Sequence, residues 1–175
     1  HYTGMQTAQA AIDRLRDPEI KVSAHYVVDE DGAIHRLVPE ERRAWHAGKG
    51  VWQGQTDCNS ASIGIEIVNP GHEWGYRDFP EAQIQAVIEL VGDIRTRWTI
   101  PDRRIIGHSD LAPDRKEDPG ENFPWAAFHE AGVPKDLVAL APLEDGDVSR
   151  YLVTHEGVGR VVLTGSYDTA RLFRS

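Results

Sequence analysis

An amphipathic helix is predicted near the start of the chain, where apolar residues recur at three- and four-residue spacing. The positions concerned are Ala8, Ala11, Ile12 and Leu15. Thr7 precedes them and offers its hydroxyl as an N-cap, whereas Asp17-Pro18 ends the pattern because proline disfavours a helical conformation in the residue before it. The sequence therefore predicts a helix between Thr7 and Asp17.

Two strand patterns follow this helix. Residues 22–28 alternate in polarity, with Val22, Ala24, Tyr26 and Val28 on one face and Ser23, His25 and Val27 on the other. The pair Asp31-Gly32 favours a tight turn into a second strand over residues 33–38. The long polar segment 40–62 comes next, and loops of that length in compact domains commonly form binding surfaces.

The third predicted strand contains a charged residue, Glu66, among apolar ones. Ile63, Ile65 and Ile67 form one buried face, so Glu66 points to the opposite face, beside Gly64 and Val68. Because Gly64 has no side chain, we expect space next to Glu66 for a water, a metal ion or a substrate. An unpaired carboxylate in an apolar strand is costly, so either a partner cation lies opposite or this face is solvated.

The longest predicted helix begins at Asp78 and Pro80 and ends at Ile100-Pro101. Its apolar stripe consists of Ile84, Val87, Ile88, Val91, Ile94 and Trp98. We expect residues 104–106 to form a short strand that places His108 at its carboxyl end, the edge where ligands of α/β sheets gather. A short closing helix is expected over residues 123–130.

Composition narrows the class of protein. The 175 residues suffice for one domain, or for one domain with an appendage, and the single cysteine, Cys58, excludes an internal disulfide. A net charge of −9 disfavours binding to nucleic acid. No apolar run reaches the length of a membrane helix and no signal peptide is visible, so the compartment, cytoplasm or periplasm and cell envelope, stays open.

A loop that builds a site is predicted between Gly107 and Gly120, a stretch too rich in proline, aspartate and glycine for helix or strand. It contains His108, Asp118 and, two residues before that carboxylate, Lys116. A catalytic zinc ion is typically held by three protein ligands and keeps a fourth position for water. This loop can supply two of the three.

Five sequence blocks, in a fixed order over roughly residues 1–130, carry a family resemblance. They are His1-Tyr2-Thr3, Val22-Ser23-Ala24-His25-Tyr26, Arg43-Ala44-Trp45-His46-Ala47-Gly48, Ser62-Ile63-Gly64-Ile65-Glu66 and the Gly107–Gly120 segment. On these blocks the chain resembles the zinc-dependent N-acetylmuramoyl-L-alanine amidases of the type-2, AmpD-like family, which are related to phage lysozyme-amidases and peptidoglycan recognition proteins. The AmpD-like branch matches better, because the phage and animal proteins carry a cysteine where this chain has Asp118.

The resemblance implies a set of site residues. His1, His108 and Asp118 would be the zinc ligands, Glu66 the general base, and Lys116 the electrophile that stabilises the oxyanion. Three further residues are implied as substrate contacts: Trp45, His46 and His25. His25 could also be a hydrogen-bond partner of a metal ligand, and an interior histidine with satisfied hydrogen bonds is an equal alternative to both roles. We interpret His35, His72, His129 and His155 as surface residues.

The resemblance also implies an architecture and an activity. The fold would be α/β, with helices on the flanks of a central mixed β-sheet. The first strand of that sheet would be truncated at the start of this chain. Residues 1–134 would form the catalytic domain, and residues 135–175 an extension of unknown function with a small hairpin at 151–154 and 160–164. We expect a monomer that hydrolyses the bond between N-acetylmuramic acid and L-alanine in peptidoglycan or anhydro-muropeptides. The negative charge favours small muropeptides.

Two other functions remain open at this point. A peptidoglycan-binding module without catalysis would share the fold, although such modules typically lose a zinc ligand and none is lost here. A zinc peptidase that cuts within the stem peptide would use the same metal chemistry.

Overall fold

A computed structural model describes residues 1–133 of the chain. Its centre is a mixed three-stranded sheet in the order β2-β1-β3, formed by β1 (Tyr26–Val28), β2 (Ile34–Arg36) and β3 (Ile65–Ile67). β1 and β2 are antiparallel, with Tyr26 opposite Arg36, and β1 and β3 are parallel, with Val27 opposite Glu66. The predicted α/β class and mixed sheet are thus confirmed, although each strand is shorter than expected.

The first residues of the chain lie along the free edge of β3. The Ile67 amide donates to the His1 carbonyl, and the Thr3 amide donates to the Ile67 carbonyl, each at 3.0 Å. Tyr2 and Ile67 form a parallel bridge. This pairing holds His1 beside β3.

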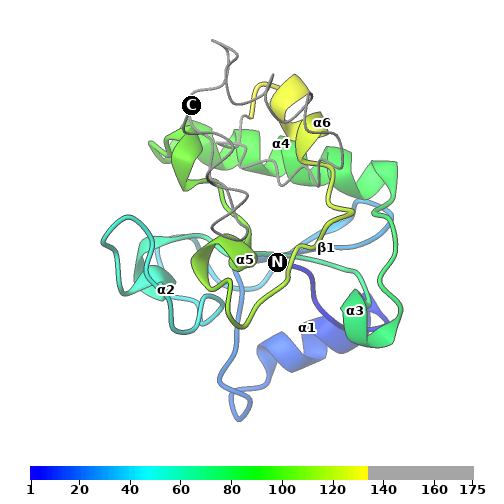
Figure 1. Ribbon diagram of the computed structural model, residues 1–175. Helices are drawn as coiled ribbons and strands as arrows, with labels where there is room; N and C mark the ends of the chain where they lie inside the picture. The colour runs from blue at the N-terminus through cyan, green and yellow to red at the C-terminus, as the bar shows by residue number, and fades with distance from the viewer. Residues whose placement is uncertain (134–175) are drawn as a thin grey trace, which may run out of the picture. The chain divides into compact units, whose positions relative to one another are not determined.

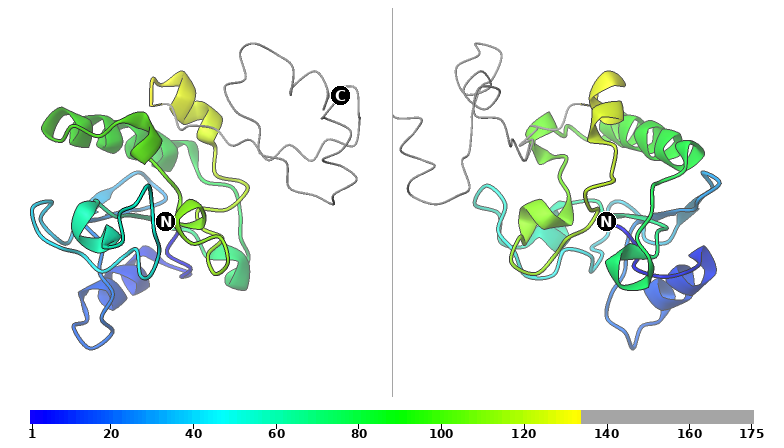
Figure 2. Two further views of the ribbon diagram at one scale, coloured as in Figure 1. Left: turned by 60° about the vertical axis from the view of Figure 1, so that its left-hand side comes forward. Right: turned by 45° about the vertical axis from the view of Figure 1, so that its right-hand side comes forward.

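Helices cover both faces of the sheet (Figures 1 and 2). On one face lie α4 (Glu81–Arg97) and α6 (Trp125–Glu130), and on the other lies α1 (Ala8–Arg16). The shorter helices are α2 (Cys58–Ala61), α3 (Gly71–Trp74), α5 (His108–Leu111) and a 3₁₀ helix, η1 (Asp102–Arg104). Thr7 caps α1 as predicted, since its hydroxyl accepts from the Ala10 amide at 3.2 Å.

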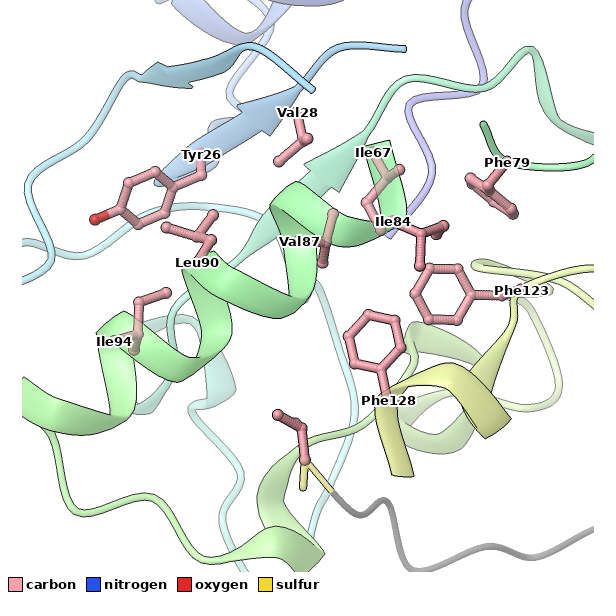
Figure 3. Packing of buried hydrophobic residues seen from close by; sticks show 11 residues of the cluster. Tyr26, Val28, Ile67, Phe79, Ile84, Val87, Leu90, Ile94, Phe123 and Phe128 are labelled. Atoms are coloured by element: carbon pink, nitrogen blue, oxygen red, sulfur yellow. The ribbon is translucent and has the colours of Figure 1, made fainter. Parts of the chain in front are cut away.

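The main core fills the space between the sheet and α4 (Figure 3). Its buried residues are Tyr26, Val28, Ile67, Phe79, Ile84, Val87, Leu90, Ile94, Phe123, Phe128 and Val133. A smaller cluster joins Ile12 of α1 to Val27 and Val68 on the other face. The alternation predicted for β1 is confirmed, because Tyr26 and Val28 belong to the first cluster and Val27 to the second.

Several local predictions were wrong. Residues 104–106 form no strand; the chain there leaves η1 in irregular conformation and enters α5 at His108. The Gly107–Gly120 segment therefore contains a helical turn that its composition had argued against. Leu90 is buried in the stripe of α4, whereas Trp98 is 39% exposed and donates its indole N–H to Glu40 at 2.6 Å. The hairpin predicted at residues 151–154 and 160–164 lies outside the described residues, and so does His155. The domain boundary at residue 134 stays a prediction.

Candidate metal centre

Three side chains from distant parts of the sequence converge on one point. The distances are 2.9 Å between the Nδ1 atoms of His1 and His108, 3.0 Å from His1 Nδ1 to Asp118 Oδ2, and 3.3 Å from His108 Nδ1 to Asp118 Oδ2. Bonds of about 2.0–2.1 Å to a tetrahedral zinc ion place donor atoms roughly 3.3 Å apart. Within residues 1–133 this is the one such group of histidine, cysteine and carboxylate side chains, and its donor set suits zinc.

Local hydrogen bonds bring together the two ends of the Gly107–Gly120 segment, here called the ligand loop. His108 is the first residue of α5, where the Gly107 amide donates to the Asp110 carboxylate at 2.7 Å. The Ser109 amide donates to the backbone carbonyl of Asp118 at 2.9 Å. The loop thus returns to the start of α5, which places Asp118 beside His108. Figures 1 and 2 both show the start of the chain next to α5.

Hydrogen bonds at the far nitrogens place a proton on Nε2 of both histidines. The Nε2 of His108 lies 2.9 Å from the Ala47 carbonyl, which accepts only, so Nε2 carries a proton and Nδ1 is the nitrogen that faces His1 and Asp118. The Nε2 of His1 lies 3.2 Å from His46 Nδ1. His46 Nε2 in turn lies 3.5 Å from the Ser62 hydroxyl, which donates to the Cys58 carbonyl at 2.5 Å. In this arrangement His46 accepts from His1, and both ligand histidines direct Nδ1 toward Asp118.

Asp118 is held as a carboxylate. Burial alone would raise its pKa, but hydrogen bonds from His1 and His108, which donate to the carboxylate when their Nδ1 atoms are protonated, outweigh burial and lower the pKa below the ordinary value for aspartate. A metal ion would take the place of these Nδ1 protons. Burial lowers the pKa of His46 to about 3, and the charges of His1 and His25 act in the same direction. His46 is therefore a neutral hydrogen-bond partner, and the three donors comprise two imidazoles and one anion.

The two predicted catalytic side chains lie within electrostatic reach of this centre. Burial raises the pKa of the Glu66 carboxyl, while the charges of His1, His108 and Lys116 oppose that rise. The Glu66 carboxylate makes no hydrogen bond with any residue in the described part of the chain. A partly buried carboxylate that has no hydrogen-bond partner and lies near a metal site is suited to accept a proton.

The space expected beside Glu66 is occupied. A Cβ atom built on Gly64 would lie 2.3 Å from Cγ of His46, so the imidazole packs directly on the glycine backbone. The prediction that Gly64 leaves room for water, metal or substrate was therefore wrong. The strand pattern contains no information about a side chain that arrives from the 40–62 loop.

His25 lies in the interior of the protein. It is fully buried, its Nδ1 accepts from the Gly64 amide at 2.9 Å, and its Nε2 donates to the Arg42 carbonyl at 3.0 Å. This burial and these two hydrogen bonds favour the alternative, an interior histidine, which here links Gly64, the residue before β3, to the 40–62 loop. By contrast, Trp45 is 55% exposed, and the Arg43 guanidinium lies 4.7 Å from its ring centroid.

The remaining histidines differ in exposure. His72 and His129 are exposed, as predicted. His35 is half-buried, and its Nε2 has no hydrogen-bond partner among the described residues. No helix in residues 1–133 is long and apolar enough to cross a membrane.

Sequence reasoning missed the residues that support the centre through the backbone. One such residue is Ala47, whose backbone carbonyl accepts from His108. Another is Arg115, whose guanidinium donates to the same backbone carbonyl. Backbone acceptors have no residue-type signature. Only the position of Ala47 directly after His46 in the third block hinted at a role.

Comparisons with known proteins agree with this geometry. A family model described as N-acetylmuramoyl-L-alanine amidase (Amidase_2) matches residues 1–121. AmiD of Escherichia coli K12, an N-acetylmuramoyl-L-alanine amidase, is 39% identical over 145 residues, which cover 76% of this chain and 51% of that protein. AmpD of the same organism, a 1,6-anhydro-N-acetylmuramyl-L-alanine amidase, is 40% identical over 129 residues, which cover 73% of this chain and 67% of AmpD.

A solved structure extends the likeness. E. coli AmiD in complex with anhydro-N-acetylmuramic acid-L-Ala-D-gamma-Glu-L-Lys matches with a TM-score of 0.74 and 33% identity. The match covers 98% of this chain and 66% of that one, so the chain spans about half to two thirds of the length of AmiD. The chain therefore belongs to the N-acetylmuramoyl-L-alanine amidase family.

Proposed function

We propose that the chain hydrolyses the amide bond between N-acetylmuramic acid and L-alanine with a zinc ion held by His1, His108 and Asp118. The observation that carries this proposal is the meeting of three donor atoms within 3.3 Å of one another, beside Glu66 and Lys116. Two neutral imidazoles and one carboxylate would leave a divalent ion with a net charge near +1. Lewis acidity toward a water and an amide carbonyl therefore survives ligation.

The chain's own residues would supply the proton transfers. Glu66 would accept the proton of the attacking water and then return it to the leaving nitrogen of L-alanine, as a general base and acid. Lys116 would place its ammonium at the oxygen that becomes negative when the carbonyl is attacked. Both side chains lie close enough for their charges to act on each other and on His1.

The substrate class follows from the relatives and from the exposed surface. AmiD is seen with an anhydro-muropeptide, and AmpD is named for the anhydro sugar. The cavity of about 580 Å³ that His1, His46 and His108 line in part is walled mainly by apolar core residues such as Ile65 and Val87. Apolar walls with a few polar groups are usual in ligand pockets, so we expect the muropeptide to bind at the opening of this cavity next to the metal centre, with exposed Trp45 as one contact.

Mass analysis of muropeptide digests tests the proposal directly. Zinc-loaded protein is expected to release free stem peptide and intact anhydro-N-acetylmuramic acid, and a chelator should stop this release. A cut within the stem peptide would make the protein a peptidase. Binding of muropeptide without any cleavage by zinc-loaded protein would make it a binding module.

A further inference from the structure

A residue outside the proposed catalytic set touches the support of a metal ligand. Arg115 lies in the ligand loop between α5 and Asp118, and its guanidinium donates to the Ala47 carbonyl at 3.1 Å and to the Lys49 carbonyl. The Ala47 carbonyl is the same oxygen that accepts the Nε2 proton of His108 at 2.9 Å. One backbone oxygen therefore has two donors, a metal ligand and an arginine.

The two donors use the full hydrogen-bonding capacity of this oxygen, because a carbonyl has two lone pairs. Ala47 is also fixed from its other side, since its amide donates to the Asn59 side chain at 2.8 Å. The Lys49 bond is different, because Lys49 belongs to an exposed stretch beyond Ala47. Arg115 thus joins the 47–49 segment to the ligand loop, and the planar guanidinium suits such a bridge because it presents several donors in fixed directions.

We propose that Arg115 is a positioning residue for the metal centre. By holding the Ala47 carbonyl in place, it keeps His108 in the orientation that directs Nδ1 toward a metal ion bound with His1 and Asp118. This inference rests on the proposed function only in that the ion is zinc. Arg115 makes no hydrogen bond with the three ligand side chains or with Glu66, so it acts through Ala47 and His108.

Two effects of the guanidinium on His108 oppose each other. A cation on the shared carbonyl withdraws electron density, which weakens the acceptor and makes His108 a slightly poorer donor to the metal. Holding the carbonyl fixed improves the geometry of the ligand. Arg115 is largely exposed, which screens its charge, so the positional effect dominates and loss of Arg115 should weaken metal binding.

The test compares Arg115→Met with Arg77→Met, in which an exposed arginine loses an ion pair to Glu30 on the surface. Zinc affinity is measured by competition with a chelator, and the metal-free proteins are compared by thermal unfolding. Loss of a group bonded directly to a metal-ligating histidine typically costs about 10- to 100-fold in affinity. Arg115 acts one hydrogen bond further away, so we expect a loss at the low end of that range, about 10-fold, for Arg115→Met and no change for Arg77→Met. Arg115→Lys should be intermediate, because a single ammonium cannot serve both carbonyls equally well.

A second readout is independent of zinc. Long-range ¹H–¹⁵N NMR of the metal-free protein detects the Nε2 proton of His108 that is bonded to the Ala47 carbonyl. In the wild-type protein this proton should be protected from exchange with water, and in Arg115→Met it should exchange faster, because the carbonyl is no longer held in place. If Arg115→Met fails to fold, Arg115→Lys takes its place in both measurements.

The outcomes separate the inference from the proposed function. Unchanged zinc affinity in Arg115→Met, or a lower unfolding temperature with unchanged affinity, would overturn the inference and leave the amidase proposal intact. An unchanged exchange rate of the His108 Nε2 proton in the variant would overturn it as well. If the wild-type protein binds no zinc, the metal assignment fails, and the NMR experiment still decides whether Arg115 acts on His108.

Discussion

Replacing Glu66 by glutamine should remove catalysis without harming the fold. The amide has nearly the same shape as the carboxylate but cannot accept the proton of the attacking water. Loss of a general base typically lowers the rate by about 10²–10⁴, which corresponds to about 2.7–5.4 kcal/mol of transition-state stabilisation. The loss should fall on kcat, because proton transfer occurs only as the bond is broken.

Although Glu66→Gln should lower the rate, we expect it to leave the stability of the fold unchanged or to increase it. The Glu66 carboxylate makes no hydrogen bond within residues 1–133, so Glu66→Gln breaks none there. Burial raises the pKa of this carboxyl, which means that folding disfavours its ionised form at neutral pH. An uncharged amide relieves that penalty, so the metal-free variant should unfold at the same temperature as wild type or higher.

The assay measures kcat and KM on an anhydro-muropeptide, zinc content after dialysis, and thermal unfolding of the metal-free protein. Glu89→Gln, which changes an exposed carboxylate on α4, serves as the control and should leave all three unchanged. Near wild-type kcat in Glu66→Gln at full zinc occupancy would refute Glu66 as the base. Loss of zinc from this variant would instead make Glu66 a fourth ligand and the centre a closed, structural one.

Three further outcomes are expected. His108→Ala and Asp118→Ala should each lose zinc on dialysis, and stoichiometric zinc by elemental analysis would exclude that residue as a ligand. Lys116→Ala should keep zinc and lose about 10²–10³ in kcat, and unchanged steady-state kinetics would exclude its role at the oxyanion. Hydrogen bonds from Arg97 and other donors lower the pKa of Glu40 to about 2. Ionised Glu40 therefore stabilises the fold above its unfolded pKa, and this stability is lost as pH falls toward 2. Glu40→Gln should therefore cost about 1–3 kcal/mol at pH 7 in chemical denaturation, with a difference from wild type that shrinks below about pH 4.5; a constant difference would contradict this.

The sequence predicted the elements with strong periodicity and failed where the periodicity was short. The stripe of α4 and the alternation around Tyr26 each extend over enough residues to indicate one type of structure. Residues 104–106 offer only two adjacent isoleucines, and such a short run is compatible with a strand or with irregular structure. Pro101 and η1 set the local conformation there instead.

The sequence blocks predicted the candidate ligands, but they did not predict the contacts that hold these ligands in place. His1 and Asp118 stand 117 residues apart, and no local pattern shows that they meet. The blocks predicted which side chains to consider because they mark chemically distinctive residues. They did not show that the His46 ring covers Gly64 or that Ala47 accepts from His108, since those contacts depend on tertiary packing and on backbone atoms.

The last residue of the ligand-loop block shows how packing and chemistry share one motif. Gly120 has φ of +88°, and a Cβ atom there would lie 2.3 Å from the hydroxyl of Tyr76. That hydroxyl donates to the Pro119 carbonyl at 2.9 Å and accepts from the Asn122 amide at 3.0 Å, so it holds the chain immediately after Asp118. Glycine is needed at this position because the tyrosine approaches the backbone so closely. The residue at the end of the block thus contributes no atom to the metal centre, yet it allows the contact that fixes the segment next to the carboxylate ligand.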